Sequence, residues 1–358
     1  APSSPLNPSS PGRWVAEADW PSTRIEEQTW ALGAGALLAP GQAKRPRDSE
    51  ALNIQSPLSV GLFAGKWCSY AEETDLPWDQ RQEDGGALLF DGPPLESDLE
   101  IMGAPVVDLD IAADQPQAMV AVRLCDVSPT GRSARVSFGI LNLTHADSHE
   151  FPRAVEPGAR QKVRVTLNNI AQHFPAGHQI RVAVSSSYWP LAWPSPRPAR
   201  LTIHPEGSRL ILPVRPPCDA DATLRPFGAP RMADPLPTTL IAPADRRWNV
   251  NLDLGSNRVQ LNVINNDARY RRDDTGMELG RDVRETYSYA NNDYATLRGF
   301  VEQIRDFRRG SWAVRTITRT TLTATEEDFV IRATLDAYEG EARVFSRSWD
   351  EIVPRNLV

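Results

Sequence analysis

The chain has 358 residues, which is long enough for two domains of ordinary size. Its 39 basic and 46 acidic side chains give a formal net charge of −7, which argues against a nucleic-acid partner and against an anionic membrane surface. No run of about 18 apolar residues occurs, so we expect no membrane-spanning segment. The 31 prolines disfavour long helices and favour strands joined by loops.

The three cysteines, Cys68, Cys125 and Cys218, are odd in number and widely spaced, which indicates neither a disulfide framework nor a metal site. Cys125 falls in an apolar strand pattern and is expected to be a buried free thiol. Unpaired cysteines favour a reducing compartment, so we expect a cytoplasmic protein. The first residues are rich in proline and serine and lack the basic and apolar regions of a signal peptide.

The N-terminal part begins with a linker and continues into a first strand. Residues 1–20 have the composition of a linker, and Trp14 and Trp20 are expected to anchor it on a folded body. A strand is predicted over residues 25–32, and residues 39–57 are polar and proline-containing, which predicts a loop.

From Gly86 the pattern becomes regular. Val107, Leu109 and Ile111 alternate with polar residues, which is typical of a half-buried strand, whereas residues 118–126 are almost all apolar and suit a central strand. Turns rich in Gly, Pro and Asp separate these segments. Further strands are predicted over residues 87–90, 99–102, 134–143, 163–167, 178–186, 201–204 and 210–214. This spacing predicts a sandwich or jelly roll.

A second domain is predicted after a proline-dense stretch. The domains we expect are a linker at 1–20, a sandwich at 21–216, a Pro-rich linker at 217–244 and an antiparallel β domain at 245–358. In this last domain we predict strands over residues 246–254, 258–263, 312–324, 328–338 and 342–348, rich in β-branched residues. Residues 297–309 fit either a helix or a strand.

Several separate motifs carry a family resemblance between Asp79 and Pro196. In chain order they are Asp79-Gln-Arg81, Leu89-Phe-Asp91, Pro94-Leu-Glu-Ser-Asp-Leu-Glu-Ile101, Gly103-Ala-Pro105, Leu124-Cys-Asp-Val127, Pro129-Thr-Gly-Arg132, Pro157-Gly158, Phe174-Pro-Ala-Gly-His178 and Val184-Ser-Ser-Ser187. In this order and spacing, the chain resembles the C-terminal domain of the X-prolyl dipeptidyl-peptidase and cocaine-esterase family of serine hydrolases, also called CocE/NonD. The resemblance covers roughly the first 215 residues.

The resemblance implies an α/β-hydrolase catalytic domain that holds the nucleophile, acid and histidine, followed by a C-terminal jelly roll. This sequence contains no Gly-x-Ser-x-Gly nucleophile elbow and no alternation of strands and helices. We therefore expect residues 1–20 to follow a missing catalytic domain. The predicted fold class is all-β, with a galactose-binding-like jelly-roll β-sandwich followed by a second, antiparallel β-meander domain.

Two clusters could suggest chemistry within the chain itself. Ser185, Ser186 and Ser187 follow His178, but a strand would place neighbouring serines on opposite faces, so we predict no local catalytic triad. His145, His149 and Glu150 could bind a metal, although their spacing differs from the His-x-His pattern of jelly-roll metalloenzymes and the segment resembles a loop. The alternative is a polar loop tied by side-chain hydrogen bonds. We predict no catalytic residue, no metal and no cofactor.

Two aromatic segments suggest contact surfaces. The segment 61–81 is a long loop whose Trp67, Tyr70, Asp75, Trp78, Asp79 and Arg81 suit either an interface to another body or a cover over one sandwich edge. The second run contains Tyr188, Trp189 and Trp193. Such rings could stack on a sugar or dock the catalytic domain, and the resemblance favours docking.

Together these observations predict the non-catalytic C-terminal portion of a serine hydrolase acting on esters or amides. The chain would brace the α/β-hydrolase domain of the same gene product and shape its substrate cleft, and this chain alone would be inactive. A homo-oligomer is a further predicted partnership. The alternative functions are a free-standing carbohydrate-binding jelly-roll module and, third, a metal-dependent jelly-roll enzyme.

Overall fold

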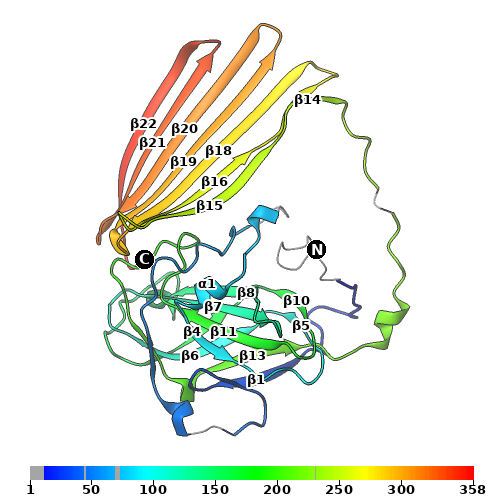
Figure 1. The fold of residues 1–358 in the computed structure, drawn as a ribbon, viewed down its shortest axis with the longest axis vertical. Helices are drawn as coiled ribbons and strands as arrows, with labels where there is room; N and C mark the ends of the chain where they lie inside the picture. Colours follow the sequence, from blue (N-terminus) through cyan, green and yellow to red (C-terminus); the bar gives the residue numbers. More distant parts are fainter. Residues whose placement is uncertain (1–11, 44–45, 69–72, 230) are drawn as a thin grey trace. The chain divides into compact units, whose positions relative to one another are not determined.

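The computed structural model describes residues 12–43, 46–68, 73–229 and 231–358. The fold is nearly all β, as predicted, and it divides into two compact units (Figure 1). The first unit extends to Pro226 and also includes Leu357 and Val358, and the second runs from Phe227 to Asn356. Within the described ranges, the helices are too short and too polar for any to cross a bilayer.

The first unit is a sandwich of two antiparallel sheets. One sheet has the order β10-β5-β13-β6-β12-β3, with β1 and β9 branching from β13 and β6 and β2 pairing with β1. The other has the order β4-β11-β7-β8. The strands are β1 Glu26–Leu32, β2 Leu37–Leu38, β3 Leu52–Ile54, β4 Leu88–Asp91, β5 Leu99–Gly103, β6 Val106–Ala113, β7 Met119–Val127, β8 Ser133–Asn142, β9 Gln161–Thr166, β10 Ile170–Phe174, β11 Gln179–Ser185, β12 Leu201–Ile203 and β13 Arg209–Val214.

The core lies between these two sheets. Inward residues of β6, such as Leu109, share one apolar cluster with inward residues of β7, such as Val122 and Leu124. The continuous apolar run in residues 118–126 is buried on both faces of β7, as predicted for a central strand. In β6, Val107, Leu109 and Ile111 are buried as predicted, but Asp110 between them is buried too, so the alternation holds only in the first half of the strand. Short helices occupy the loops: η1 Pro46–Ser49, η2 Glu73–Asp75, α1 Arg81–Asp84, η3 Leu143–His145, η4 Pro205–Gly207 and η5 Asp219–Thr223.

Buried ion pairs hold the N-terminal segment, whose two tryptophans stay largely exposed. Trp14 and Trp20 are 71% and 60% exposed. Arg215, which is almost fully buried, instead contacts Glu17 at 2.7 Å and Asp221 at 2.7 Å. These pairs fix the segment after Gly12 against the end of β13.

The second unit is one antiparallel sheet of long strands (Figure 1). The order is β14-β17-β18-β19-β20-β21-β22, and the β15–β16 hairpin joins through β16 to β18. The strands are β14 Thr238–Ala242, β15 Asp245–Asp253, β16 Arg258–Asn266, β17 Arg269–Arg272, β18 Met277–Ala290, β19 Asp293–Arg309, β20 Trp312–Ala324, β21 Asp328–Glu339 and β22 Ala342–Pro354. The ambiguous residues 297–309 are therefore strand, and the expected linker 217–244 contributes β14.

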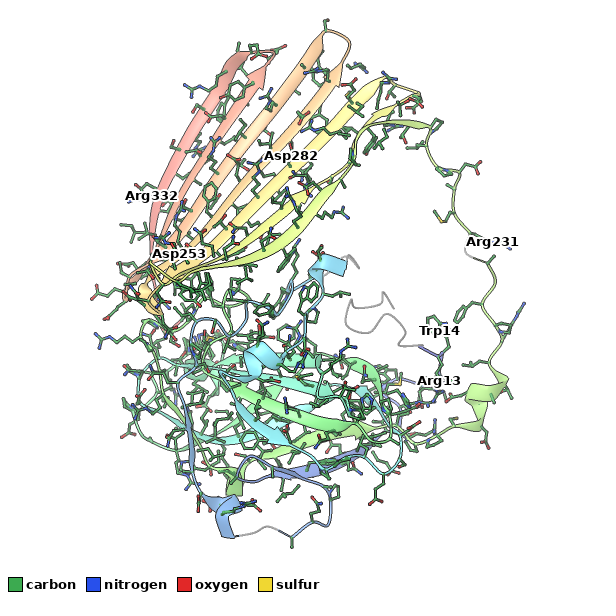
Figure 2. The ribbon with its side chains drawn as sticks, viewed as in Figure 1. Arg13, Trp14, Arg231, Asp253, Asp282 and Arg332 are labelled. Atoms are coloured by element: carbon green, nitrogen blue, oxygen red, sulfur yellow. The ribbon has the colours of Figure 1, made fainter. Side chains whose placement is uncertain are left out.

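The two faces of the second sheet differ. Residues paired across an antiparallel ladder share a face, and residues alternate along each strand. One face carries ion pairs between neighbouring strands, such as Asp282 with Arg269 at 2.7 Å and Glu302 with Arg319 at 2.7 Å. Asp282 of β18 and Arg332 of β21, both labelled in Figure 2, lie on this face. The opposite face carries the apolar residues Leu261, Tyr287, Leu322 and Ile331, with Gly299 between Tyr287 and Leu322, and it also carries the ion pair of Arg281 with Asp267 at 3.3 Å.

Candidate functional site

The long loop before β4 covers the outer face of the four-stranded sheet, and a group of buried charges fixes it there. Asp84, in α1, contacts Arg123 of β7 at 3.0 Å and Arg181 of β11 at 2.7 Å. The two arginines lie on the same outer face, because Arg123 pairs with Ala183 and Arg181 pairs with Cys125. The Arg123 side chain has no exposed surface. One carboxylate thus joins the loop to two neighbouring strands.

Gln80 and Glu83 form hydrogen bonds to backbone groups in two parts of the same loop, at Phe63 and at Trp78. The Gln80 side-chain amide donates to the carbonyl oxygens of Phe63 at 3.2 Å and Trp78 at 2.7 Å, and its oxygen accepts from Arg123 Nη1 at 3.1 Å. Glu83 Oε1 accepts from the Phe63 amide at 2.7 Å. Burial raises the pKa of the Glu83 carboxyl above its usual value, and the charge of Arg123 opposes this rise.

Two glycines allow the loop to approach its neighbours closely. Gly61 has φ +116°, and a Cβ built there would lie 2.3 Å from the carbonyl oxygen of Trp189. Gly65 has φ +69°, and its Cβ would lie 2.5 Å from the Asp75 carbonyl oxygen. Any larger residue at these two positions is both strained in its backbone and too close to another backbone.

The predicted loop residues are of two kinds: exposed aromatic rings and charged side chains that form ion pairs within the loop. Trp67 is 65% exposed and Trp78 is 45% exposed. Asp75 is buried and contacts Lys66 at 3.1 Å, whereas Asp79 pairs with the exposed Arg81 at 2.6 Å. Tyr70 lies outside the described residues. The loop therefore covers the outer face of the sheet rather than an edge, and it presents two indole rings to its surroundings. Its use as an interface stays a prediction.

Trp67 rests on an aromatic stack that continues into the sheet. Its ring centroid lies 5.5 Å from that of Phe138, nearly perpendicular to it, and Phe138 lies 5.7 Å from Tyr188. Arg135 lies over the Phe138 ring and donates from Nη1 to the Tyr188 hydroxyl at 2.6 Å. Burial raises the pKa of the Tyr188 phenol to about 12, although Arg135 opposes the rise. The exposed Trp67 indole thus packs on two buried aromatic rings, one of which is fixed by the hydrogen bond from Arg135.

The second predicted aromatic surface is largely internal. Tyr188 and Trp189 have no exposed surface, and Trp193 is half-buried. Tyr188 packs in a cluster with Val60 and Met119, which lie in the covering loop and on the outer face of the sheet. This corrects the expectation that Tyr188 and Trp189 face a partner or a sugar. Tyr188 fills the layer between the loop and the sheet, and Trp189 is equally buried.

The polar clusters form other local structures. Ser185 Oγ donates to the Ser187 carbonyl oxygen at 3.0 Å, and Ser186 Oγ accepts from the Ser56 amide at 2.9 Å. His178 Nδ1 lies 2.7 Å from an oxygen of Asp126, whose pKa burial raises and His178 lowers. Ser185 and Ser186 therefore tie backbone segments together.

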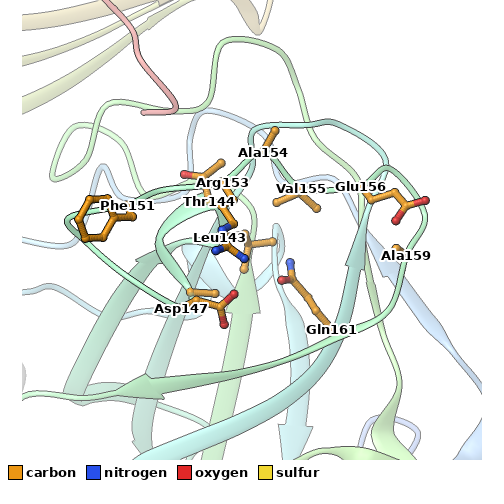
Figure 3. A pocket seen from close by; sticks show the side chains of 11 residues that line it. Leu143, Thr144, Asp147, Phe151, Arg153, Ala154, Val155, Glu156, Ala159 and Gln161 are labelled. Atoms are coloured by element: carbon orange, nitrogen blue, oxygen red, sulfur yellow. The ribbon is translucent and has the colours of Figure 1, made fainter.

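His145 and His149 lie side by side, with their Nδ1 atoms 3.4 Å apart, and Glu150 is an exposed loop residue. In the described ranges no three His, Cys, Asp or Glu side chains gather as a metal-ion site. A nearby cavity of about 200 Å³ is lined by Leu143, Thr144, Phe151 and Gln161, among others (Figure 3). The His145–Glu150 loop is thus one wall of a small surface hollow.

Comparisons with known proteins agree with the sequence motifs. The family described as the X-Pro dipeptidyl-peptidase C-terminal non-catalytic domain matches residues 5–224. A putative serine esterase of Mycobacterium bovis is 27% identical over 231 residues, covering 57% of this chain and 36% of the relative. The cocaine esterase of a Rhodococcus species is 27% identical over 116 residues, covering 32% of this chain and 20% of the esterase.

Two solved structures are similar as well. An α-amino acid ester hydrolase has a TM-score of 0.46 at 24% identity and covers 52% of this chain and 36% of its own. An aminopeptidase from a marine sediment archaeon has a TM-score of 0.48 at 19% identity and covers 60% of this chain and 39% of its own. This chain therefore spans only about a third or less of the lengths of the curated relatives described here.

Fold and site together define a β-sandwich domain with a rigid aromatic loop on one sheet. The match over residues 5–224 makes the assignment specific: the chain belongs to the family of X-Pro dipeptidyl-peptidase C-terminal non-catalytic domains. The predicted resemblance to the CocE/NonD hydrolases is confirmed.

Proposed function

We propose that this chain braces the α/β-hydrolase domain of the same gene product, a serine hydrolase acting on esters or amides, and walls part of its substrate cleft. The observation that supports this function is the pair of exposed indoles, Trp67 and Trp78, on a loop fixed by buried charges. Large aromatic side chains are the residues that most often contribute binding energy at protein interfaces. A loop already held in place loses little conformational entropy when a partner binds.

We propose the cytoplasm as the location of the protein. Cys68, Cys125 and Cys218 are all free thiols, and free thiols persist in a reducing compartment.

The docking surface is tested with the hydrolase domain of the gene product, made separately and titrated against this chain by calorimetry. Trp67→Ala combined with Trp78→Ala should weaken binding at least tenfold, because each removes an exposed ring that the partner would cover. Phe151→Ala is the matched control, since Phe151 is also 67% exposed but lies on a different loop. Unchanged binding by the tryptophan variant, or equal loss in the control, would reject the docking surface.

The hydrolase role is tested independently with a fluorophosphonate probe, which labels activated serines. We expect no label on this chain alone and a label on the gene product that contains the hydrolase domain. Labelling of the isolated chain would contradict the non-catalytic role, whatever the calorimetry gives.

A further inference from the structure

Strand β22 forms one edge of the second sheet and is open along its length. It pairs with β21 on one side, and almost every residue from Ala342 to Pro354 is exposed. Val344, Phe345, Ile352 and Val353 are between 46% and 67% exposed. A long edge strand with apolar side chains and unpaired backbone groups is a template for another strand.

The ends of the open segment are marked by irregular backbone. The ladder with β21 is interrupted between Ala337 and Tyr338, which leaves Val344 as an extra residue on β22. At the other end Pro354 has no N–H to donate. Bulges and prolines are the devices that stop edge pairing, and none lies between Phe345 and Val353. The regular part of the edge therefore has its midpoint at Trp349.

We propose that β22 pairs with β22 of a second copy of this chain, antiparallel, around a two-fold axis at Trp349. A two-fold axis gives every contact twice and closes the assembly at a dimer. In this register Arg347 faces Glu351 of the second copy, and Phe345 faces Val353 of the second copy. Trp349 faces its own equivalent.

The pattern of side chains suits this register. Phe345, Arg347, Trp349, Glu351 and Val353 all lie on one face of β22, because residues alternate along a strand. Cross-strand pairs of opposite charge and of apolar side chains stabilise a sheet, and like charges directly opposite destabilise it. Moving the axis by one residue, to Ser348, would place Phe345 opposite Glu351 and bring the bulge into the ladder. Charge and apolar matching therefore both favour the axis at Trp349.

The first test reverses one charge of the proposed pair in the full chain. Arg347→Glu puts two carboxylates opposite each other twice, which should raise the dimer dissociation constant about tenfold or more at low salt. The double variant Arg347→Glu with Glu351→Arg restores opposite charges and should restore the dimer. Arg309→Glu makes the same charge change at an exposed position of β19 and should leave the dimer unchanged.

The second test traps the axis directly. In a chain carrying Cys68→Ser and Cys218→Ser, Trp349→Cys should form a disulfide-linked dimer on mild oxidation, since directly opposed residues lie about 4.5–5.5 Å apart between Cα atoms. Ser346→Cys should not, because its two copies would be about 20 Å apart along the strands.

Sedimentation velocity over a concentration series measures the first test, and non-reducing electrophoresis measures the second. A chain that stays monomeric throughout the series would overturn the proposal. So would a dimer that tolerates Arg347→Glu and gives no Trp349→Cys cross-link.

Discussion

Asp84 connects a loop to two strands through the two arginines it binds. Arg123 is fully buried, so its charge depends for compensation on the Asp84 carboxylate, the Gln80 oxygen and the nearby Glu83 carboxyl. Replacing such a pair with well-packed apolar residues can be neutral, but removing one partner leaves a charge buried without compensation. The anchor of the aromatic loop is therefore sensitive to a single substitution.

We expect Asp84→Ala to lower the free energy of unfolding of the first unit by about 3–5 kcal/mol, because it removes the carboxylate that pairs with the buried guanidinium of Arg123. Denaturant titration followed by circular dichroism measures the change. Glu206→Ala is the control: Glu206 pairs with Arg160 at 3.1 Å on the surface, and its loss should cost less than about 1 kcal/mol. Equal losses in the two variants would contradict the role given to Asp84.

Glu83 predicts a pH dependence with a definite sign. Because burial raises its pKa in the folded state above the ordinary 4.5, its contribution to stability is fully present below that value and is lost as the pH rises through the folded-state pKa. Glu83→Gln keeps an acceptor for the Phe63 amide but cannot ionise. The variant should therefore gain stability relative to the wild type between pH 4.5 and neutrality. Denaturant titrations over a series of pH values measure the difference in the free energy of unfolding between Glu83→Gln and the wild type. A difference that stays constant with pH would refute this prediction.

At the scale of elements, the covering loop explains why β7 is buried on both faces. The apolar run of β7 predicts a central strand, and the structure confirms it. The burial of Tyr188 and Trp189 could not be predicted in the same way. Tyr188 is covered by Val60 and Ala64, which are far away in sequence, and a local pattern contains no signal of that contact.

Strand β18 shows a second limit of sequence patterns. Its residues include Arg281, Asp282, Arg284 and Glu285, which suggest a solvated surface rather than a strand. In the sheet, Asp282 is matched by Arg269, which comes from β17. The long strands rich in β-branched residues, β20 and β21, were predictable from composition, whereas β18 depends on partners that only the fold supplies.

A strained backbone conformation costs about 1–3 kcal/mol. We expect Gly61→Ala to lower the free energy of unfolding of the first unit by more than this, because the new Cβ also clashes with the Trp189 carbonyl oxygen. Gly131→Ala is the matched control, since Gly131 also has positive φ, at +81°, but has open space around its missing Cβ. Thermal unfolding compares the two. If Gly131→Ala costs as much, then close approach is not what requires glycine at position 61.

At the scale of the whole molecule, the chain between the units is predicted to be the first site of cleavage. Phe227, Arg231 and Met232 are exposed side chains outside any strand, and Figure 2 labels Arg231. Exposed segments without secondary structure are where proteases cut folded proteins.

Limited trypsin treatment should cut first after Arg231, because Arg225 precedes a proline, which blocks cleavage. Mass spectrometry should find two fragments that each resist further digestion, corresponding to the two units. Early cuts inside β15–β22 would contradict two independently compact units.

The layer between the loop and the four-stranded sheet also contains a chemical reporter. Cys125 lies on the same face of β7 as Arg123, has no exposed surface, and has its pKa raised to about 11 by burial. A thiol in this state reacts only when the loop lifts away, since the thiolate is the reactive form and no reagent can reach it otherwise. With Cys68 and Cys218 replaced by serine, the labelling rate of Cys125 would time the opening of the loop in the native protein, and a bound hydrolase domain should slow it.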